Sequence, residues 1–380
     1  MKRALCAALM LLCAVLLSGC MSRQLEEQML VIILGVDTPR ADAVRLTVKV
    51  PSNAAADAGG QAGEAGEQMG YLLLEATGRT FSDAIELLSA TTPRTLNFSQ
   101  VREVVIGEEA AADAAFGDWL EDVYALPRMR PSAAVVVCRG EAKDFVEAQK
   151  PYVGIRLSRY IETTLSNYAG KGFVPTTTLG EALRDLRYGF RDPLLVCGGV
   201  NDFSRAENEP PAHALDEKAG ELTRKSVNPV ELFGAAATDG VSVSGLLTGH
   251  EMALLHLLLG SVQALSMEVS GAPVSLFARA PAALAADTGA SPVQLRVGLL
   301  CDAHYLPGHE PDAEHIRQTL EKDVTALIRH LQAAGCDGLG FGNIAVRGFR
   351  TIPEWEAFDW RRQYQAAETD VHIEVRLRRN

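Results

Sequence analysis

The sequence lacks the short motifs by which many enzymes and metalloproteins are recognised. It contains no G-x-S-x-G nucleophile elbow, no phosphate-binding P-loop and no C-x-x-C pair. Acidic residues outnumber basic ones by 48 to 36, and the net charge of −12 argues against binding to nucleic acid or electrostatic binding to anionic lipid. After the first 20 residues no segment reaches the ~18 consecutive apolar residues that predict a membrane-spanning helix. The closest segment, 253–265, is short and is interrupted by polar residues.

Cysteines beyond the first 20 residues are few and lie far apart in the sequence. Because no two of them have metal-ligand spacing, we expect neither a zinc site nor a redox motif. Their number is even, so disulfides stay open as an alternative. Each lies in or beside an apolar stretch, however, which favours buried free thiols at Cys138, Cys197, Cys301 and Cys336.

The N-terminus has the three-part pattern of an export signal. Lys2 and Arg3 form a positive start, an apolar stretch follows to Ser18, and small residues precede Cys20. The segment "LSGC" resembles a lipobox, in which the cysteine is diacylated and becomes the first residue of the mature protein. We therefore predict a signal peptide at 1–19 and lipidation at Cys20; an ordinary signal peptide that happens to contain a cysteine is the alternative. Two acyl chains would give stable membrane residence, because one chain alone binds only marginally.

Two groups of histidines were candidates for a metal site. In "GHEMALLH", His250 and His256 are six residues apart, whereas a zinc-protease helix places its histidines four apart on one face. Six residues correspond to a rotation of about 240° beyond one full turn, so we expect only a helix start with Glu251 and a core histidine. The second group contains His304, His309 and His315 and lies around a Pro/Gly/Asp-rich segment. This composition predicts a polar loop, and a surface metal site is the alternative.

Two further segments of the C-terminal part have more than one interpretation. "GLGFGN" (338–343) follows a predicted helix and does not lead from a strand into a helix, so it lacks the context of a phosphate-binding loop. We expect its glycines to permit tight turns or close packing where the chain passes from that helix to a strand. "IPEWEAFDW" (352–360) forms an aromatic patch that either covers a core or contacts a partner.

Hydrophobic periodicity predicts an α+β protein of three domains, with mixed or antiparallel sheets covered on one side by helices. The N-terminal α+β domain is expected at 20–200. Two of its predicted helices begin with capping boxes, at Thr80 and Thr178, and an Ala/Gly-rich loop is expected at 51–68.

The two remaining domains are predicted at 201–261 and 262–380. The first of them starts with a charged, proline-containing linker or exposed loop (204–226), followed by a small α+β unit with a hairpin turn at Asp239-Gly240. The C-terminal α+β domain has strands in which apolar and polar residues alternate, a long helix that begins at Asp312, and a last strand whose apolar residues face one way.

Several longer segments together resemble one known family. After the lipobox come "MLVIILGVD", "ATGRTFSDAIELLSATTPRTLNFSQVREVVIGEEAA", "FGAAATDGVSVSGLLTGHEMALLHLLLG" and "LQAAGCDGLGFGNIAVRGFRTIPEWEAFDW". In this order and spacing they are similar to the Ger(x)C family, the lipoprotein C subunits of spore germinant receptors. The resemblance covers nearly the whole chain after the leader and is distributed over it.

The resemblance implies a non-enzymatic subunit without cofactors, folded as a three-domain α+β body. The expected partners are the A-type and B-type multi-pass membrane subunits of the receptor, and the expected location is the outer face of the spore inner membrane, held by the lipid on Cys20. Two alternatives are a lipid-anchored extracytoplasmic solute-binding protein, which predicts a cleft between two similar lobes, and a lipid-anchored hydrolase, which predicts a catalytic set that the sequence does not display.

Overall fold

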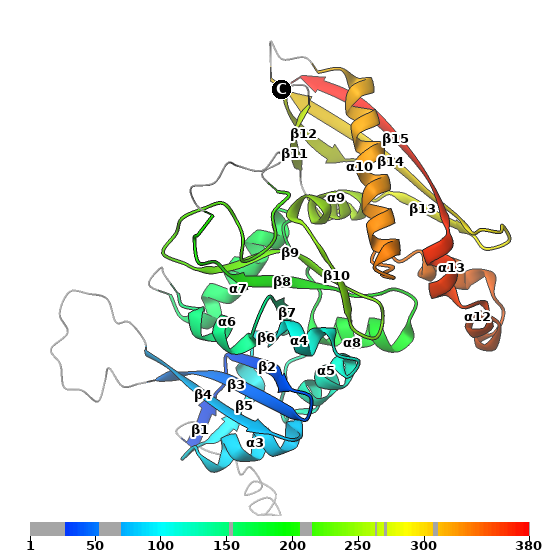
Figure 1. Ribbon diagram of the computed structural model, residues 1–380. Helices are drawn as coiled ribbons and strands as arrows, with labels where there is room; N and C mark the ends of the chain where they lie inside the picture. Colours follow the sequence, from blue (N-terminus) through cyan, green and yellow to red (C-terminus); the bar gives the residue numbers. More distant parts are fainter. Residues whose placement is uncertain are drawn as a thin grey trace, which may run out of the picture.

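The computed structural model describes residues 27–52, 70–151, 155–205, 215–262, 264–269, 272–306 and 311–379. These residues form an α+β structure with one large mixed sheet, one smaller sheet and a pair of short parallel strands. Figure 1 shows the large sheet in the blue to green half of the molecule and the smaller sheet in the yellow to red half. The predicted signal peptide and Cys20, the Ala/Gly-rich segment from residue 53 and His309 all lie outside the described residues.

The large sheet has eight strands in the order β10-β9-β8-β7-β6-β2-β3-β4. Its central strands β2, β6, β7 and β8 run parallel, and antiparallel strands extend both edges. The strand bounds are β2 Ile33–Arg40, β3 Ala43–Ser52, β4 Gly70–Gly78, β6 Glu103–Ile106, β7 Ala134–Cys138, β8 Leu194–Val200, β9 Val230–Thr238 and β10 Val243–Leu247; the short pair is β1 Gln28–Leu30 with β5 Thr95–Asn97.

Helices cover both faces of the large sheet, so the expectation of one-sided cover is wrong for this sheet. Four parallel central strands are joined by helical crossovers, which lie on both faces when the strands are buried on both sides. One face packs on α3 (Phe81–Ala90), α4 (Glu108–Ala112), α5 (Phe116–Ala125) and α8 (Leu179–Tyr188). The other packs on α6 (Ala142–Ala148) and α7 (Leu157–Gly170). The sequence had not predicted α6.

The predicted capping boxes begin their helices as expected. Thr80 accepts a hydrogen bond from the backbone of Asp83 and Asp83 accepts one from Thr80 in return, at the start of α3. Thr178 and Glu181 make the same reciprocal pair at the start of α8. These pairs satisfy N–H groups that the first helical turn leaves without partners.

A buried polar cluster lies inside the large sheet beneath α6. Lys49 and Glu103 flank Ile33 on neighbouring strands. The ammonium group of Lys49 donates to the carbonyls of Val146 and Gln149 at 2.6 Å each, at the C-terminal end of α6, and burial lowers the pKa of Lys49 to about 8. Burial raises the pKa of Glu103 to about 8; its Oε2 accepts from the Gln149 side chain at 3.1 Å.

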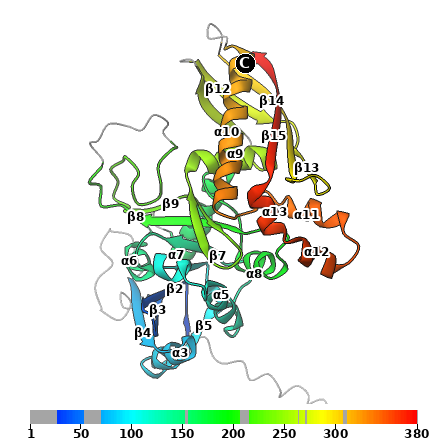
Figure 2. The ribbon, with the colours of Figure 1, turned by 45° about the vertical axis from the view of Figure 1, so that its right-hand side comes forward.

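The smaller sheet is the core of the C-terminal part. It contains β11 (Leu265–Val269), β12 (Ala272–Ala278), β13 (Ala283–Asp287), β14 (Gln294–Tyr305) and β15 (Glu368–Arg379). The long helix α10 (Ala313–Ala333) begins at the predicted cap Asp312 and packs on one face of this sheet, as seen from two sides in Figures 1 and 2. Alternate residues of β14 are buried, which fits a sheet covered on one face.

The remaining helices are α9 (Gly249–Leu259), α11 (Gly342–Ala345), α12 (Ile352–Phe358) and α13 (Trp360–Ala366), with 3₁₀ turns η2 (Phe98–Gln100) and η3 (Val346–Gly348). Among the described residues, no helix has the length and apolar character needed to cross a bilayer.

The predicted hairpin at Asp239-Gly240 is present, but its strands β9 and β10 continue the large sheet instead of forming a separate one. The sheet thus crosses the predicted boundary at residue 200. Part of the expected exposed loop also packs on this sheet: Ala219 is fully buried, and the backbone N–H of Gly220 donates to the buried carboxylate of Glu231 at 2.7 Å. The domain boundaries themselves stay a prediction.

Candidate functional site at the junction of the two sheets

A buried aspartate organises the "GLGFGN" segment. Oδ1 of Asp337 accepts hydrogen bonds from the backbone N–H groups of Gly340 and Phe341, both at 2.9 Å. Its Oδ2 accepts from the N–H of Gly342 at 2.6 Å and from the indole N–H of Trp360 at 3.1 Å. Asp337 is 3% exposed, and burial raises its pKa, while the four donors oppose that rise. The segment therefore folds around a carboxylate and leads into short helices, not directly into a strand as predicted.

A second aspartate connects this segment to the large sheet. Asp192 precedes β8, and its Oδ2 accepts from the backbone N–H of Asp337 at 2.8 Å. In return, the N–H of Asp192 donates to the carbonyl of Asp337 at 3.3 Å. Oδ1 of Asp192 accepts from Arg361 of α13 at 2.8 Å. Burial raises the pKa of Asp192 to about 6, although the Arg361 charge favours the ionised form. The two halves of the molecule thus share a buried polar contact.

Aromatic side chains continue the junction from the core towards the surface. Trp360 stacks on Trp355 with ring centroids 5.8 Å apart, and Trp355 meets Phe190 edge-on at 6.0 Å. Phe190 in turn stacks on Tyr188 at 6.5 Å, and Tyr188 is 63% exposed. Trp355 and Trp360 are buried, so these two tryptophans of the predicted aromatic patch cover the core.

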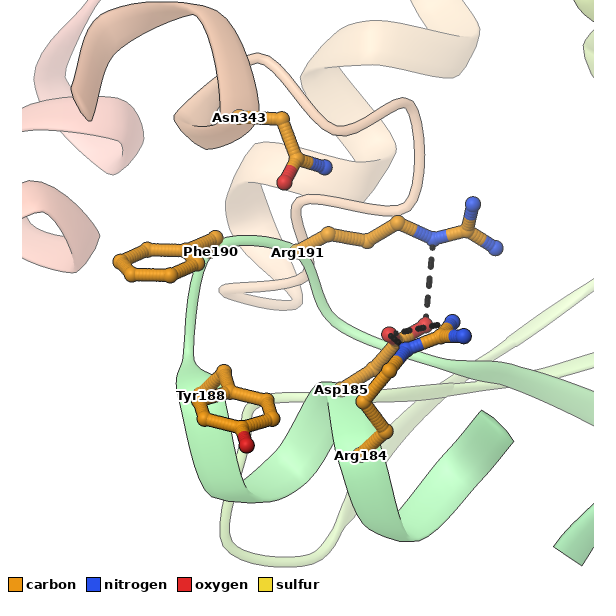
Figure 3. Close-up of a pocket in the computed structure, with 6 residues that line it drawn as sticks. All are labelled: Arg184, Asp185, Tyr188, Phe190, Arg191 and Asn343. Carbon is orange, nitrogen blue, oxygen red and sulfur yellow. Dashed lines mark hydrogen bonds and ion pairs between the residues drawn. The ribbon is translucent and has the colours of Figure 1, made fainter. Parts of the chain in front are cut away.

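A cavity of about 290 Å³ lies beside the junction, between α8 and α11. Figure 3 shows the rings of Tyr188 and Phe190 on one side, the guanidinium groups of Arg184 and Arg191 on the other, and Asn343 reaching in from α11. Aromatic surface next to a few polar groups is a common composition for a binding pocket.

The polar side of this cavity contains hydrogen-bonding capacity that the protein leaves unused. Asp185 is 8% exposed, and its Oδ1 accepts from Nε and Nη2 of Arg184 at 2.9 and 2.8 Å. Its Oδ2 is 3.4 Å from Nε of Arg191, at ion-pair distance but without hydrogen-bond alignment. Both of these atoms are buried without a hydrogen-bond partner among the described residues. The Asp185 carboxylate and the two guanidinium groups make this side of the cavity charged, whereas the arrangement offers no nucleophile with an adjacent base.

The histidines of "GHEMALLH" have separate partners in the structure. His256 is buried and its ring nitrogens contact Ser261 at 2.6 Å and the carbonyl of Val174 at 2.9 Å. Glu251 caps the start of α9 and pairs with His330. His250 lies 3.6 Å from Asp323. No group of metal-ligating side chains is found in the part of the chain that the structure describes.

The four later cysteines are free and buried, as predicted. Burial raises the pKa of the thiols of Cys138, Cys197, Cys301 and Cys336, to about 12 for Cys197 and Cys301. None of the four is therefore activated as a nucleophile. Asp192 and Asp337 were not predicted as a pair, because 144 residues separate them in sequence and neither belongs to a recognised motif. An aspartate directly before a glycine-rich segment was the only available signal.

The fold, with its two unlike sheets, has a counterpart among solved structures. It is similar to the fold in the crystal structure of the GerBC protein, with a TM-score of 0.53 at 12% identity, over 90% of this chain and 96% of that one. A family model described as the spore germination protein N-terminal domain matches residues 21–197, and one described as spore germination B3/GerAC like, C-terminal, matches residues 313–380. The chain belongs to the Ger(x)C family of spore germination proteins.

Two curated relatives match along almost their whole length. The spore germination protein KC of Bacillus subtilis (strain 168) is 22% identical, with 100% of this chain and 96% of the relative covered. A second protein of the same organism, YfkR, which is also named for spore germination, is 21% identical over 97% of this chain and 94% of its own length.

Proposed function

We propose that the protein is the lipid-anchored C subunit of a spore nutrient germinant receptor and is required for germination in response to nutrients. The observation that carries the proposal is the full-length similarity to spore germination proteins, combined with the GerBC-like fold. The A-type and B-type multi-pass subunits would be its partners, on the outer face of the spore inner membrane. The protein would act through binding, without catalysis and without a cofactor.

The lipid anchor at Cys20 explains how a chain with a net charge of −12 would stay at a membrane surface. Anionic lipid repels a protein of this charge, so acyl chains would supply the attachment to the membrane. Confinement to the membrane plane would also raise the effective concentration of the subunit for its partners.

A cysteine substitution tests the anchor. Cys20→Ala is expected to move the protein from the membrane pellet to the soluble or secreted fraction. Cys13→Ala is the matched control, because Cys13 lies in the same leader without a preceding Leu-Ser-Gly triplet, and it is expected to leave the protein in the pellet. Retention of Cys20→Ala in the pellet, at the level of the control, would disprove the anchor.

Affinity purification tests the complex. The tagged protein would be isolated from detergent-solubilised spore inner membranes, and its partners identified by mass spectrometry. Recovery of a transporter-like protein together with a second multi-pass protein is expected. Recovery of an importer permease and its ATPase would instead favour the solute-binding alternative, which the difference between the eight-stranded and five-stranded sheets does not support.

A further inference from the structure

The last strand of the chain is an edge of the smaller sheet. β15 pairs in parallel with β14 from Glu368 to Arg379, and no strand among the described residues pairs with its other side. A twelve-residue open edge is long enough to pair with another chain unless it is protected.

Hydrogen bonds show which backbone groups point away from β14. The N–H of Glu368 donates to the carbonyl of Val293, just before β14, at 2.9 Å. The N–H of Ile373 instead donates to the side chain of Glu321 on α10, at 3.1 Å. Because neighbouring residues of a strand direct their N–H and C=O groups to opposite sides, the odd-numbered residues from 369 to 377 direct theirs to the open edge.

The side chains of β15 divide in the same way between two faces. The odd-numbered residues lie on the face packed against α10, and Ile373 at their centre is fully buried. The even-numbered residues from 368 to 378 are all exposed on the opposite face. The first of them are acidic and the last two are arginines.

This charge order is self-complementary. If a second copy of β15 pairs antiparallel with Ile373 opposite Ile373, every exposed cross-strand pair joins an acidic residue to a basic residue or to histidine: Glu368 with Arg378, Asp370 with Arg376, and His372 with Glu374. The odd-numbered residues would then form the hydrogen-bonded pairs, which is the alignment that their outward backbone groups require. Centring the pair on residue 372 would place Asp370 opposite Glu374, and centring it on residue 374 would place Glu374 opposite itself. Like charges directly opposite each other are destabilising.

We propose that β15 is a homotypic interaction surface, at which two copies of the chain pair antiparallel about Ile373 and join their smaller sheets into one. The occupant is a second copy because the edge strand's own charge order is its complement. Pairing requires Glu321 to release the N–H of Ile373, and Glu321 keeps Arg317 as an ionic partner. Arg378 lies 3.5 Å from Asp302, and Glu368 accepts a hydrogen bond from Gln294 at 2.7 Å. Contacts with β14 therefore hold the side chains of Arg378 and Glu368 on the exposed face. This inference does not depend on the lipid anchor or on the proposed receptor complex.

Charge reversal tests the proposal on the full chain by sedimentation equilibrium in density-matched detergent. The wild type is expected to show a monomer–dimer equilibrium. The acidic variant Arg376→Glu/Arg378→Glu and the basic variant Glu368→Arg/Asp370→Arg are each expected to dimerise at least about tenfold more weakly, because their exposed pairs become like-charged. An equimolar mixture restores opposite charges in every altered pair and is expected to recover dimerisation as a heterodimer, which also shows that both variants are folded.

Cysteine pairing tests the register. His372 and Glu374 face each other in the proposed dimer at a distance that a disulfide can span. A mixture of His372→Cys and Glu374→Cys chains should form an intermolecular disulfide on mild oxidation, whereas His372→Cys alone should not, because two copies of residue 372 are offset. A wild type that stays monomeric at every concentration would overturn the proposal. So would an acidic variant that dimerises as the wild type does, or equal cross-linking in the single-variant control.

Discussion

The substitution Asp337→Asn tests whether the buried carboxylate holds the junction together. The two side chains have nearly the same shape, but asparagine replaces one acceptor oxygen by an NH₂ group. Each oxygen of Asp337 accepts two N–H donors, so either orientation of the amide leaves two buried donors facing another donor. A buried group without its partner costs about 1–3 kcal/mol. With two such donors, we expect the free energy of unfolding to fall by about 2–6 kcal/mol.

Urea unfolding, followed by tryptophan fluorescence and far-UV circular dichroism, would measure this loss. Tryptophan fluorescence reports on the site directly, because the indole N–H of Trp360 donates to Asp337. Asp287→Asn is the matched control: Asp287 accepts one backbone N–H, from Gly289, in an exposed turn. That control should change the stability by less than about 0.5 kcal/mol. A loss below about 1 kcal/mol for Asp337→Asn would refute the view that the folded "GLGFGN" segment depends on the carboxylate of Asp337.

Three further predictions concern other parts of the core. Burial raises the pKa of Glu103 to about 8. Between about pH 4.5 and 8 the folded state therefore keeps a proton that the unfolded chain releases. The free energy of unfolding falls as the pH rises through that window, by up to about 1.4 kcal/mol per pH unit. Glu103→Gln should remove this slope in urea midpoints measured across the window, and parallel slopes for variant and wild type would contradict the assignment. Gly342→Ala should lose about 1–3 kcal/mol in urea unfolding, because its Cβ would lie 2.5 Å from the carbonyl oxygen of Phe190, whereas Gly117→Ala has open space and should lose nothing. The four buried thiols should react with a thiol reagent only after urea is added, as followed by absorbance; fast labelling of the native protein would show that the cysteines are accessible.

Local features of the fold were predictable because their signals are contained in a few adjacent residues. The capping boxes at Thr80 and Thr178, the hairpin at Asp239-Gly240 and the buried thiols all follow from short segments. The face division of the last strand was also predictable, since alternation of apolar and polar residues is a period-two signal.

Features that depend on distant segments were not predictable in the same way. The sequence around the Asp239-Gly240 hairpin says where the two strands turn, but not that β9 would pair with β8 from the preceding block. The same limit applies to the junction, where Asp192 and Asp337 meet only after both sheets have formed. The role of Glu231 was hidden for the opposite reason: the charged segment that donates to it has the composition of a solvent-exposed loop.

The position of β8 has a practical consequence for dividing the chain into fragments. The match to the N-terminal family model ends at residue 197, inside β8, which runs from Leu194 to Val200. A fragment cut there would lose β9 and β10 and would expose the hydrogen-bonding edge of a central strand, an arrangement prone to aggregation. It would also leave Asp192 without Asp337 and Arg361. Fragments for binding studies should therefore keep the chain through Leu247 at least, and those that probe the junction need both sheets.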